Sequence, residues 1–278
     1  MLGIALMAAG TSLEEVSTSI GKAQMKKRIE TPYTYGVLTA SVAFLMFSVS
    51  GLIRFSSQHF DAASLPTLVL RIVLEIVQAT VTIHAIKFAD RSTYGFLRTL
   101  TIPGLLLVDL SLAYRIDAMQ FVGICFIVLA LLLLFLNHGF SKHGTWLVVI
   151  SALNAVLTTS LYKYNITHFN SPEVEQLIVL PILALFFITM AIFKDKRNPF
   201  LLFRHPLCLV QAGFMGAGSI LDALSLLFGV PSVLVAVKRT TGVFMSVLLG
   251  HAVFAEKHLI LKITAFVLCG TGILLLAL

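Results

Sequence analysis

Charged residues are scarce in this chain of 278 amino acids: Asp, Glu, Lys and Arg together make up 12% of the sequence, whereas 58% of its residues are hydrophobic. Soluble domains typically contain about 25% charged residues. The mean hydropathy is +0.96, and apolar runs of about 20 residues, long enough to cross a bilayer as helices, recur along the chain. These features exclude an ordinary soluble globular protein and predict an integral membrane protein.

Cysteine is also rare. Cys125, Cys208 and Cys269 stand singly in apolar stretches, without paired spacing and without a nearby histidine pattern. This distribution argues against a disulfide framework and a metal centre, so we expect packing roles for the three thiols, no metal site and no cofactor. A basic segment before the first apolar run is missing too, which argues against a cleavable signal peptide.

Charges and prolines divide the sequence into ten predicted helices joined by short connections. Because each half would contain five helices, an odd number, a tandem duplication places the two copies in opposite orientations. The sequence therefore predicts an all-α integral membrane protein, an inverted repeat of two five-helix halves, residues 1–138 and 139–278. The approximate helix ranges are 1–21, 33–53, 65–88, 92–114, 118–136, 144–165, 172–193, 206–229, 231–254 and 259–278.

The basic residues, which give the chain a net charge of +7, are unevenly distributed between the two sides of these helices. Only Arg54, Arg115 and Lys163 fall on one side. The positive-inside rule would then place both termini outside and the basic side in the cytoplasm, and it explains the charge without a nucleic acid partner. The thirteen residues of the basic side are Lys22, Lys26, Lys27, Arg28, Lys87, Arg91, Lys142, Lys194, Lys196, Arg197, Arg204, Lys257 and Lys262.

Two adjacent acids, Glu14 and Glu15, lie inside the first apolar segment. A charged acid at the bilayer centre costs roughly 2.5 to 3.5 kcal/mol, so intramembrane acids are usually functional. The stretch 13–22 is nearly repeated at 153–163, where Thr-Ser-Ile-Gly-Lys becomes Thr-Ser-Leu-Tyr-Lys and the acids are missing. We therefore expect a duplicated unit in which Glu14 or Glu15 couples proton movement, with a purely structural tie as the alternative.

Other polar residues inside the predicted spans fall on single helical faces. Arg71, Glu75 and Gln78 follow the i, i+4, i+7 pattern, and Arg71 can pair with Glu75 one turn away. Lipid cannot satisfy such groups, so these faces should meet protein or water and bind substrate, with a structural ion pair as the alternative at Arg71. The further candidates for substrate binding on these faces are Tyr94, Arg98, Asn154, Tyr162, Gln211 and Asp222.

Two adjacent cations, Lys238 and Arg239, lie near the start of the predicted helix 231–254, at a place that matches Arg98 in the helix 92–114. Two opposed helices would then present cations to one central space. Charge-assisted hydrogen bonds there could hold an anionic or zwitterionic solute. The alternative is that these long side chains extend to the membrane interface.

With these features the chain resembles the drug/metabolite transporter superfamily, specifically its ten-helix EamA-like members. The resemblance covers the whole chain and includes the stretch Lys-Arg-Thr-Thr-Gly-Val-Phe at 238–244. The first helix is also similar to that of small multidrug resistance pumps, whose single membrane glutamate binds protons and cationic drug in turn. Aligning that motif on Val16 selects Glu15, whereas aligning it on Lys22 selects Glu14.

The resemblance implies a basket of helices around a central cavity, alternating access, and transport of small metabolites or drugs that is often outward and proton-linked. Relatives that move phosphates or nucleotide sugars place a basic pair against the phosphate, and Lys238 and Arg239 lie at a comparable position. The family usually has its amino terminus in the cytoplasm, opposite to the orientation that the charge distribution favours.

We therefore expect no enzyme but a multi-pass secondary transporter of the bacterial plasma (inner) membrane. It would export or exchange a small polar metabolite, anionic or zwitterionic such as an amino acid, with transport coupled to protons. The lipid bilayer is its expected surrounding, and a homodimer is compatible with the sequence. A lipid or organophosphate flippase is the alternative. A lipid-modifying enzyme is less favoured, because no carboxylate or histidine cluster has a spacing suited to Mg²⁺ or Zn²⁺.

Overall fold

The computed structural model describes residues 2–53, 59–111, 118–136, 143–225, 228 and 231–277. These residues form α-helices and short 3-10 helices, and they contain no β-strand. The predicted all-α fold class is therefore confirmed for this part of the chain. The predicted boundary between the halves, at residues 138 and 139, lies outside the described residues, as do Arg54, Arg115 and Lys142.

Nine of the ten predicted helices each correspond to one helix of the structure, and the remaining one is divided in two. The first helix continues to Lys26, further than predicted. The helices are α1 (Leu2–Lys26), α2 (Pro32–Ile53), η2 (Ala62–Ser64), α3 (Leu65–Phe88), α4 (Arg91–Arg98), α5 (Thr101–Ser111), α6 (Ala118–Leu136), α7 (Thr145–His168), α8 (Pro172–Phe193), η3 (Pro199–Arg204), α9 (Pro206–Ser225), α10 (Pro231–Phe254) and α11 (Leu259–Ala277).

The predicted continuous helix 92–114 is wrong, because the chain breaks between α4 and α5 at Thr99 and Leu100. Pro103 explains the break: it has no N–H to donate to the carbonyl of Thr99, and its ring would collide with that carbonyl in a continuous helix. The hydroxyl of Thr99 donates to the carbonyl of Phe96 at 2.6 Å, and the hydroxyl of Thr101 donates to that of Arg98 at 2.8 Å. The carbonyl of Phe96 also accepts the backbone N–H of Thr99 at 3.0 Å, so the hydroxyls supplement the backbone bonds around the break.

Four helical segments of the described chain are long and apolar enough to cross a membrane: Pro32–Leu52, Ala62–Phe88, Thr145–His168 and Pro172–Phe193. Shorter apolar stretches lie in α6 and α11. The helices α1 and α10, which are not among these four, also carry charged residues: Glu14 and Glu15 in α1, and Lys238 and Arg239 in α10. The structure thus supports a membrane protein, and any further spans must keep their charged faces away from lipid.

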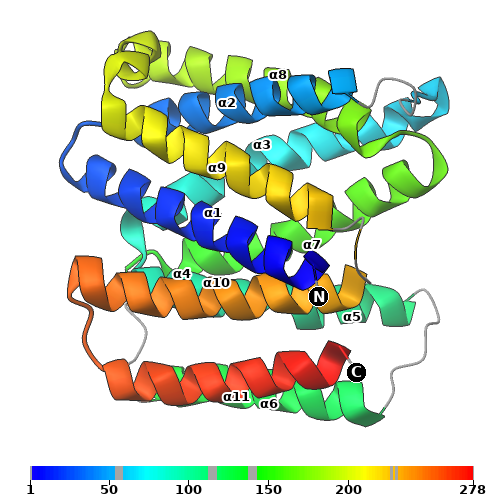
Figure 1. Cartoon of the computed structure of the whole chain (residues 1–278), viewed down its shortest axis with the longest axis vertical. Helices are drawn as coiled ribbons and strands as arrows, with labels where there is room; N and C mark the ends of the chain where they lie inside the picture. The colour runs from blue at the N-terminus through cyan, green and yellow to red at the C-terminus, as the bar shows by residue number, and fades with distance from the viewer. Residues whose placement is uncertain are drawn as a thin grey trace.

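The helices lie side by side, and the two chain termini lie on the same side of the bundle, at the right-hand ends of α1 and α11 (Figure 1). The pair α2 and α8 forms one end of the long axis, and the pair α6 and α11 forms the other. The helix α1 lies between them and packs against α9 and α10. The helix that carries Glu14 and Glu15 therefore lies between the two ends of the long axis.

Apolar side chains cover the outside. Exposed leucine, valine, isoleucine and phenylalanine side chains recur along α6 and α11, whereas α1 exposes large apolar side chains only at Leu2 and Ile4. A helix that is apolar on its outer face needs lipid or another protein there. The polar stripe of α1 is buried within the bundle, and Lys238 and Arg239 of α10 are partly buried.

Candidate functional site

A polar stripe runs along α1. Thr11, Glu15, Thr18 and Lys22 are separated by four, three and four residues, a spacing that places them on one face of an α-helix. All four side chains are buried. The neighbouring acid, Glu14, faces α9, where it accepts a hydrogen bond from the hydroxyl of Ser219 at 3.3 Å. The helix α1 therefore directs its two acids toward different neighbours.

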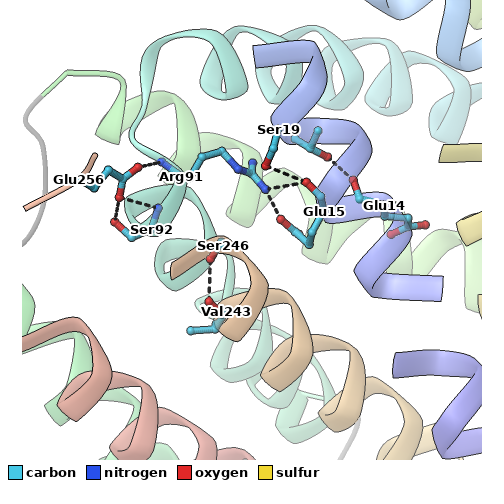
Figure 2. Close-up of polar contacts among 9 residues, drawn as sticks. Glu14, Glu15, Ser19, Arg91, Ser92, Val243, Ser246 and Glu256 are labelled. Carbon is cyan, nitrogen blue, oxygen red and sulfur yellow. Dashed lines mark hydrogen bonds and ion pairs between the residues drawn. The ribbon is translucent and has the colours of Figure 1, made fainter. Parts of the chain in front are cut away.

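Glu15 forms an ion pair with Arg91, the first residue of α4, as Figure 2 shows. The Arg91 side chain is fully buried and that of Glu15 is 7% exposed. The guanidinium also lies 5.3 Å from the centre of the Tyr94 ring. Charges this deeply buried are tolerated only as partners, since an unpaired buried ion would cost several kcal/mol.

Glu256, in the connection between α10 and α11, holds the start of α4 from the other side (Figure 2). It accepts a bond from the backbone N–H of Arg91 at 2.5 Å and another from the hydroxyl of Ser92, and it pairs with Lys262 at 2.9 Å. Burial would raise the pKa of this carboxyl, but the hydrogen bonds from Ser92 and Lys262 outweigh burial and keep the pKa below its ordinary value. An acid at a helix N-terminus is also favoured by the helix dipole.

Glu14 shares a cation with Asp222. The ammonium of Lys238 on α10 lies 3.1 Å from Oε2 of Glu14 and 2.5 Å from Oδ2 of Asp222 on α9. Gly10 and Gly218 make room for the two acids, since a Cβ on Gly10 would overlap Oδ1 of Asp222 and one on Gly218 would lie 2.7 Å from Cγ of Glu14. Close packing of α1 against α9 therefore brings two carboxylates to one lysine.

A small cavity of about 20 Å³ lies between α1, α4 and α10, enough for roughly one water molecule. Its charged lining residues are Glu14, Glu15, Arg98, Lys238 and Arg239. Among the described residues neither Arg98 nor Arg239 forms an ion pair with an acid. Three helices thus surround this cavity with two arginines whose charge is not matched by a partner of their own.

The remaining polar candidates form a second cluster, between α3, α7 and α8. Arg71 pairs with Glu175 of α8, and its predicted partner Glu75 is more distant at 3.7 Å. The guanidinium also stacks 4.3 Å from the centre of the Tyr162 ring. Glu175 in turn accepts a bond from Asn170 at 2.8 Å. These contacts join side chains of α3, α7 and α8, which fits a role in holding three helices together.

The amide pair Gln78 and Asn154 extends this second cluster along α3 and α7. Asn154 donates to Oε1 of Gln78 at 3.0 Å and to the carbonyl of Leu74 at 2.9 Å, and Gln78 donates to Ser151 at 3.0 Å. Gln211 belongs to neither cluster. It is fully buried on α9, and its backbone carbonyl accepts a hydrogen bond from the hydroxyl of Ser17 at 2.7 Å.

The structure therefore divides the candidates that the sequence placed around one space. Near the small cavity lie Glu14, Glu15, Tyr94, Arg98, Asp222, Lys238 and Arg239. In the second cluster lie Arg71, Glu75, Gln78, Asn154 and Tyr162. We call the first group, together with Arg91, the central charge cluster.

A larger cavity of about 530 Å³ opens where α1, α3 and α10 end. We call it the basic vestibule, because Lys22, Lys26, Arg28 and Lys87 line it, with Asp90 and Glu256 as acids. Glu256 contacts Arg91, whose partner Glu15 lines the small cavity. The Arg91 to Glu15 pair thus lies between the vestibule and the small cavity.

Two residues of these clusters were not among the candidates from the sequence. The charge pattern places Arg91 in a basic connection and does not single out Glu175, yet both are fully buried in ion pairs. The spacing of Arg91, Tyr94 and Arg98, three and then four residues, could have indicated one polar face on α4. For Glu175 no such signal exists, because its partner lies 104 residues away in the sequence.

Within the described residues, no group of three His, Cys, Asp or Glu side chains is arranged to hold a metal ion. No protein-family model matches the sequence, and no curated protein is detectably similar to it.

Proposed function

We propose that this protein is a secondary transporter that moves a small anionic or zwitterionic solute by alternating access between two halves. The observation that carries the proposal is the pair Arg98 and Arg239, which face one cavity without acidic partners among the described residues. Arg98 belongs to the first proposed half and Arg239 to the second. A carboxylate or phosphate bound between them would be held by both halves at once, through charge-assisted hydrogen bonds.

The helix contacts support the proposed inverted repeat. Exchanging the halves pairs α1 with α7, α2 with α8, α3 with α9, α4 and α5 with α10, and α6 with α11. Under this exchange the packing of α1 on α9 corresponds to that of α7 on α3, and that of α1 on α10 to that of α7 on α4. The contacts of α2 with α8 and of α6 with α11 map onto themselves. Such a pattern is expected of two copies related by a two-fold axis in the membrane plane.

In this proposal the basic vestibule is the route from one side of the membrane, and the Arg91 to Glu15 pair closes it toward the central charge cluster. The positive-inside rule assigns the vestibule to the cytoplasm. Ten spans, a bacterial inner membrane and membership of the drug/metabolite transporter superfamily are parts of the same proposal.

The test is uptake into proteoliposomes of labelled amino acids, carboxylates and phosphate esters, with and without a pH gradient. For the substrate that is transported, Arg98→Gln and Arg239→Gln should each raise the half-saturating concentration about 10- to 100-fold, because a hydrogen bond to a charged group contributes about 1.5 to 3 kcal/mol. The matched control is Arg204→Gln, at an exposed arginine of η3, which should transport as the unsubstituted protein does. Unaltered transport in both cavity variants would contradict the proposal.

A lipid or organophosphate flippase is the second candidate. The width and the positive lining of the basic vestibule, about 530 Å³ at the ends of three helices, favour it because a phosphate head group would fit there. Exchange of fluorescent phospholipids between leaflets of the same proteoliposomes separates the two functions.

A further inference from the structure

Two carboxylates and one ammonium meet at the contact between α1, α9 and α10. Glu14 and Asp222 both lie within ion-pair distance of the Lys238 ammonium, at 3.1 Å and 2.5 Å. With both acids ionised and the lysine protonated, the group carries one negative charge in excess. That charge lies inside a helix bundle, where an ion needs compensation by its surroundings, and the further cations near it are Arg98 and Arg239 at the small cavity.

Asp222 provides a second, independent observation. Its side chain is buried, with 8% of the residue exposed, and its Oδ1 atom has no hydrogen-bond partner among the described residues. This oxygen points at the backbone of α1, where the absence of a side chain at Gly10 leaves the space that it occupies. A buried carboxylate oxygen without a donor is costly while the group is ionised, and protonation removes that charge.

We propose that Glu14, Asp222 and Lys238 form a proton-binding site at which the two carboxyl groups share one proton. A proton from solvent adds to one carboxylate, Lys238 keeps its own proton, and the group changes from one negative charge to neutrality. Two carboxylates near each other bind one proton more tightly than an isolated acid does, because the second negative charge raises the proton affinity of the first.

The other charged groups around the site fit this assignment. Glu15 is not part of this group, because its carboxylate contacts Arg91 instead. Ser219 donates to Glu14, and Ser225 donates to the backbone carbonyl of Asp222 rather than to its side chain. The cations that face Glu14 across the small cavity are Arg98 of α4 and Arg239 of α10.

Those two arginines determine whether anion binding and proton binding favour or oppose each other. This consequence rests on the proposed function. Their charge disfavours protonation of Glu14, and an anion bound to them would offset it. Anion binding therefore raises the proton affinity, and by reciprocity the proton raises the affinity for the anion. The cargo and the proton would then bind together rather than in competition.

The experiment is a pH titration of the purified protein in nanodiscs, followed by the infrared band of protonated carboxyl groups. It needs no substrate, so its result is independent of whether the protein transports anything. All samples carry Glu30→Gln, because burial raises the pKa of Glu30 to about 7 and its band would otherwise interfere. Asp61→Asn, at a residue that caps the short helix η2, is the matched control.

Three substitutions are expected to shift the pH of this titration, two of them to lower pH and one to higher pH. Asp222→Asn and Glu14→Gln each leave one acid fully paired with Lys238, so the titration should move to lower pH by about 1 to 3 pH units. Lys238→Gln removes the shared cation and should move it to higher pH. Asp61→Asn should leave it in place. The proposal fails if the titration stays at the same pH in Asp222→Asn or Glu14→Gln, or if Lys238→Gln moves it to lower pH.

Folding of each variant is checked by gel filtration and circular dichroism, and the three variants are independent. If one of them does not fold, the other two still decide the sign of the shift. Expected shifts in protein that shows no transport would support the proton site and reject the proposed function. Unshifted titrations in protein that transports an anion would reject the proton site and support the proposed function.

Discussion

At the scale of single residues, Arg91 connects two cavities of the structure. Its backbone is held by Glu256 and its guanidinium by Glu15, so it joins the wall of the basic vestibule to the wall of the small cavity. Removing one partner of a buried ion pair typically costs about 3 to 5 kcal/mol, because the other charge is left unpaired. Any movement that separates this pair therefore needs a compensating ion, which a bound anion could supply to Arg91.

Glu30 shows the opposite situation, a buried acid without a cation. It lies between α1 and α2, is 2% exposed, and neither carboxyl oxygen has a hydrogen bond of good geometry within the described structure. The nearest polar groups are the Cys208 thiol and the Gln211 amide of α9. Burial raises the pKa of Glu30 from 4.5 to about 7, and the two neighbours offset only part of this rise.

This pKa predicts a stability that falls as the pH rises. Between pH 4.5 and about 7 the unfolded chain has lost the Glu30 proton while the folded protein keeps it, so the free energy of unfolding decreases through this window, by roughly 3 kcal/mol in total. Glu30→Gln should remove that decrease and be more stable than the unsubstituted protein at pH 8. Thermal unfolding in detergent at a series of pH values measures it.

Glu256 is the contrasting case for this measurement. Because its pKa lies below the ordinary value in the folded protein, it stabilises the fold above the pKa of the unfolded carboxyl and loses this effect as the pH falls. Glu256→Gln should therefore destabilise the protein at neutral pH, where Glu30→Gln stabilises it. The same sign of effect in both variants would contradict the assigned environments.

At the scale of elements, the contact between α4 and α10 depends on one glycine. A Cβ on Gly95 would lie 2.7 Å from the Cβ of Ser246 and would overlap its hydroxyl. This close approach brings Arg98 of α4 and Arg239 of α10 to one cavity. The short helix α4, ended by the break before Pro103, is therefore held mainly by its packing against neighbours and by Glu256.

We predict that Gly95→Ala destabilises the protein by about 1 to 3 kcal/mol, the usual cost of overpacking. Gly213→Ala on α9 is the matched control, because a Cβ there would meet nothing within 4 Å. The second substitution Ser246→Gly, combined with Gly95→Ala, should restore much of the loss by removing the side chain that collides. Denaturation midpoints of the four proteins measure this. Equal midpoints for Gly95→Ala and Gly213→Ala would show that the two helices do not pack this closely.

At the scale of the whole molecule, the structure has a wide opening at its basic end and a much smaller cavity at its centre, with volumes of about 530 Å³ and 20 Å³. Lys87 lines the opening and is exposed, whereas Thr11 is 2% exposed at the central cavity. The two positions are therefore expected to differ in access from solvent.

Labelling with a membrane-impermeant thiol reagent tests this arrangement, after Cys125, which is exposed, has been replaced by serine. Lys87→Cys should react quickly. Thr11→Cys should react at least about tenfold more slowly, because a local opening free energy of only about 1.4 kcal/mol already gives that factor. In intact cells, Lys87→Cys should be labelled only after permeabilisation if the basic end faces the cytoplasm. Labelling from outside without permeabilisation would reverse the orientation that the charge distribution favours.

Helix positions were largely predictable from the sequence because hydropathy and proline act locally. Nine predicted helices have single counterparts in the structure, and the break in the predicted helix 92–114 follows from Pro103. Partners were not predictable. The sequence suggested Glu75 as the partner of Arg71, one turn away, but Arg71 contacts Glu175 more closely, because side chains of α8 reach the buried face of α3.

By itself, the sequence determined that this chain is helical, avoids water over most of its surface and carries acids and bases where lipid would not accept them, because composition and periodicity depend only on residue order. Tertiary packing decided which charges neutralise one another. Glu15 meets a guanidinium 76 residues away, while Glu14 shares one lysine with Asp222. Adjacent residues on a helix point about 100° apart, so two neighbouring acids acquired different surroundings that only the arrangement of α4, α9 and α10 around α1 could assign.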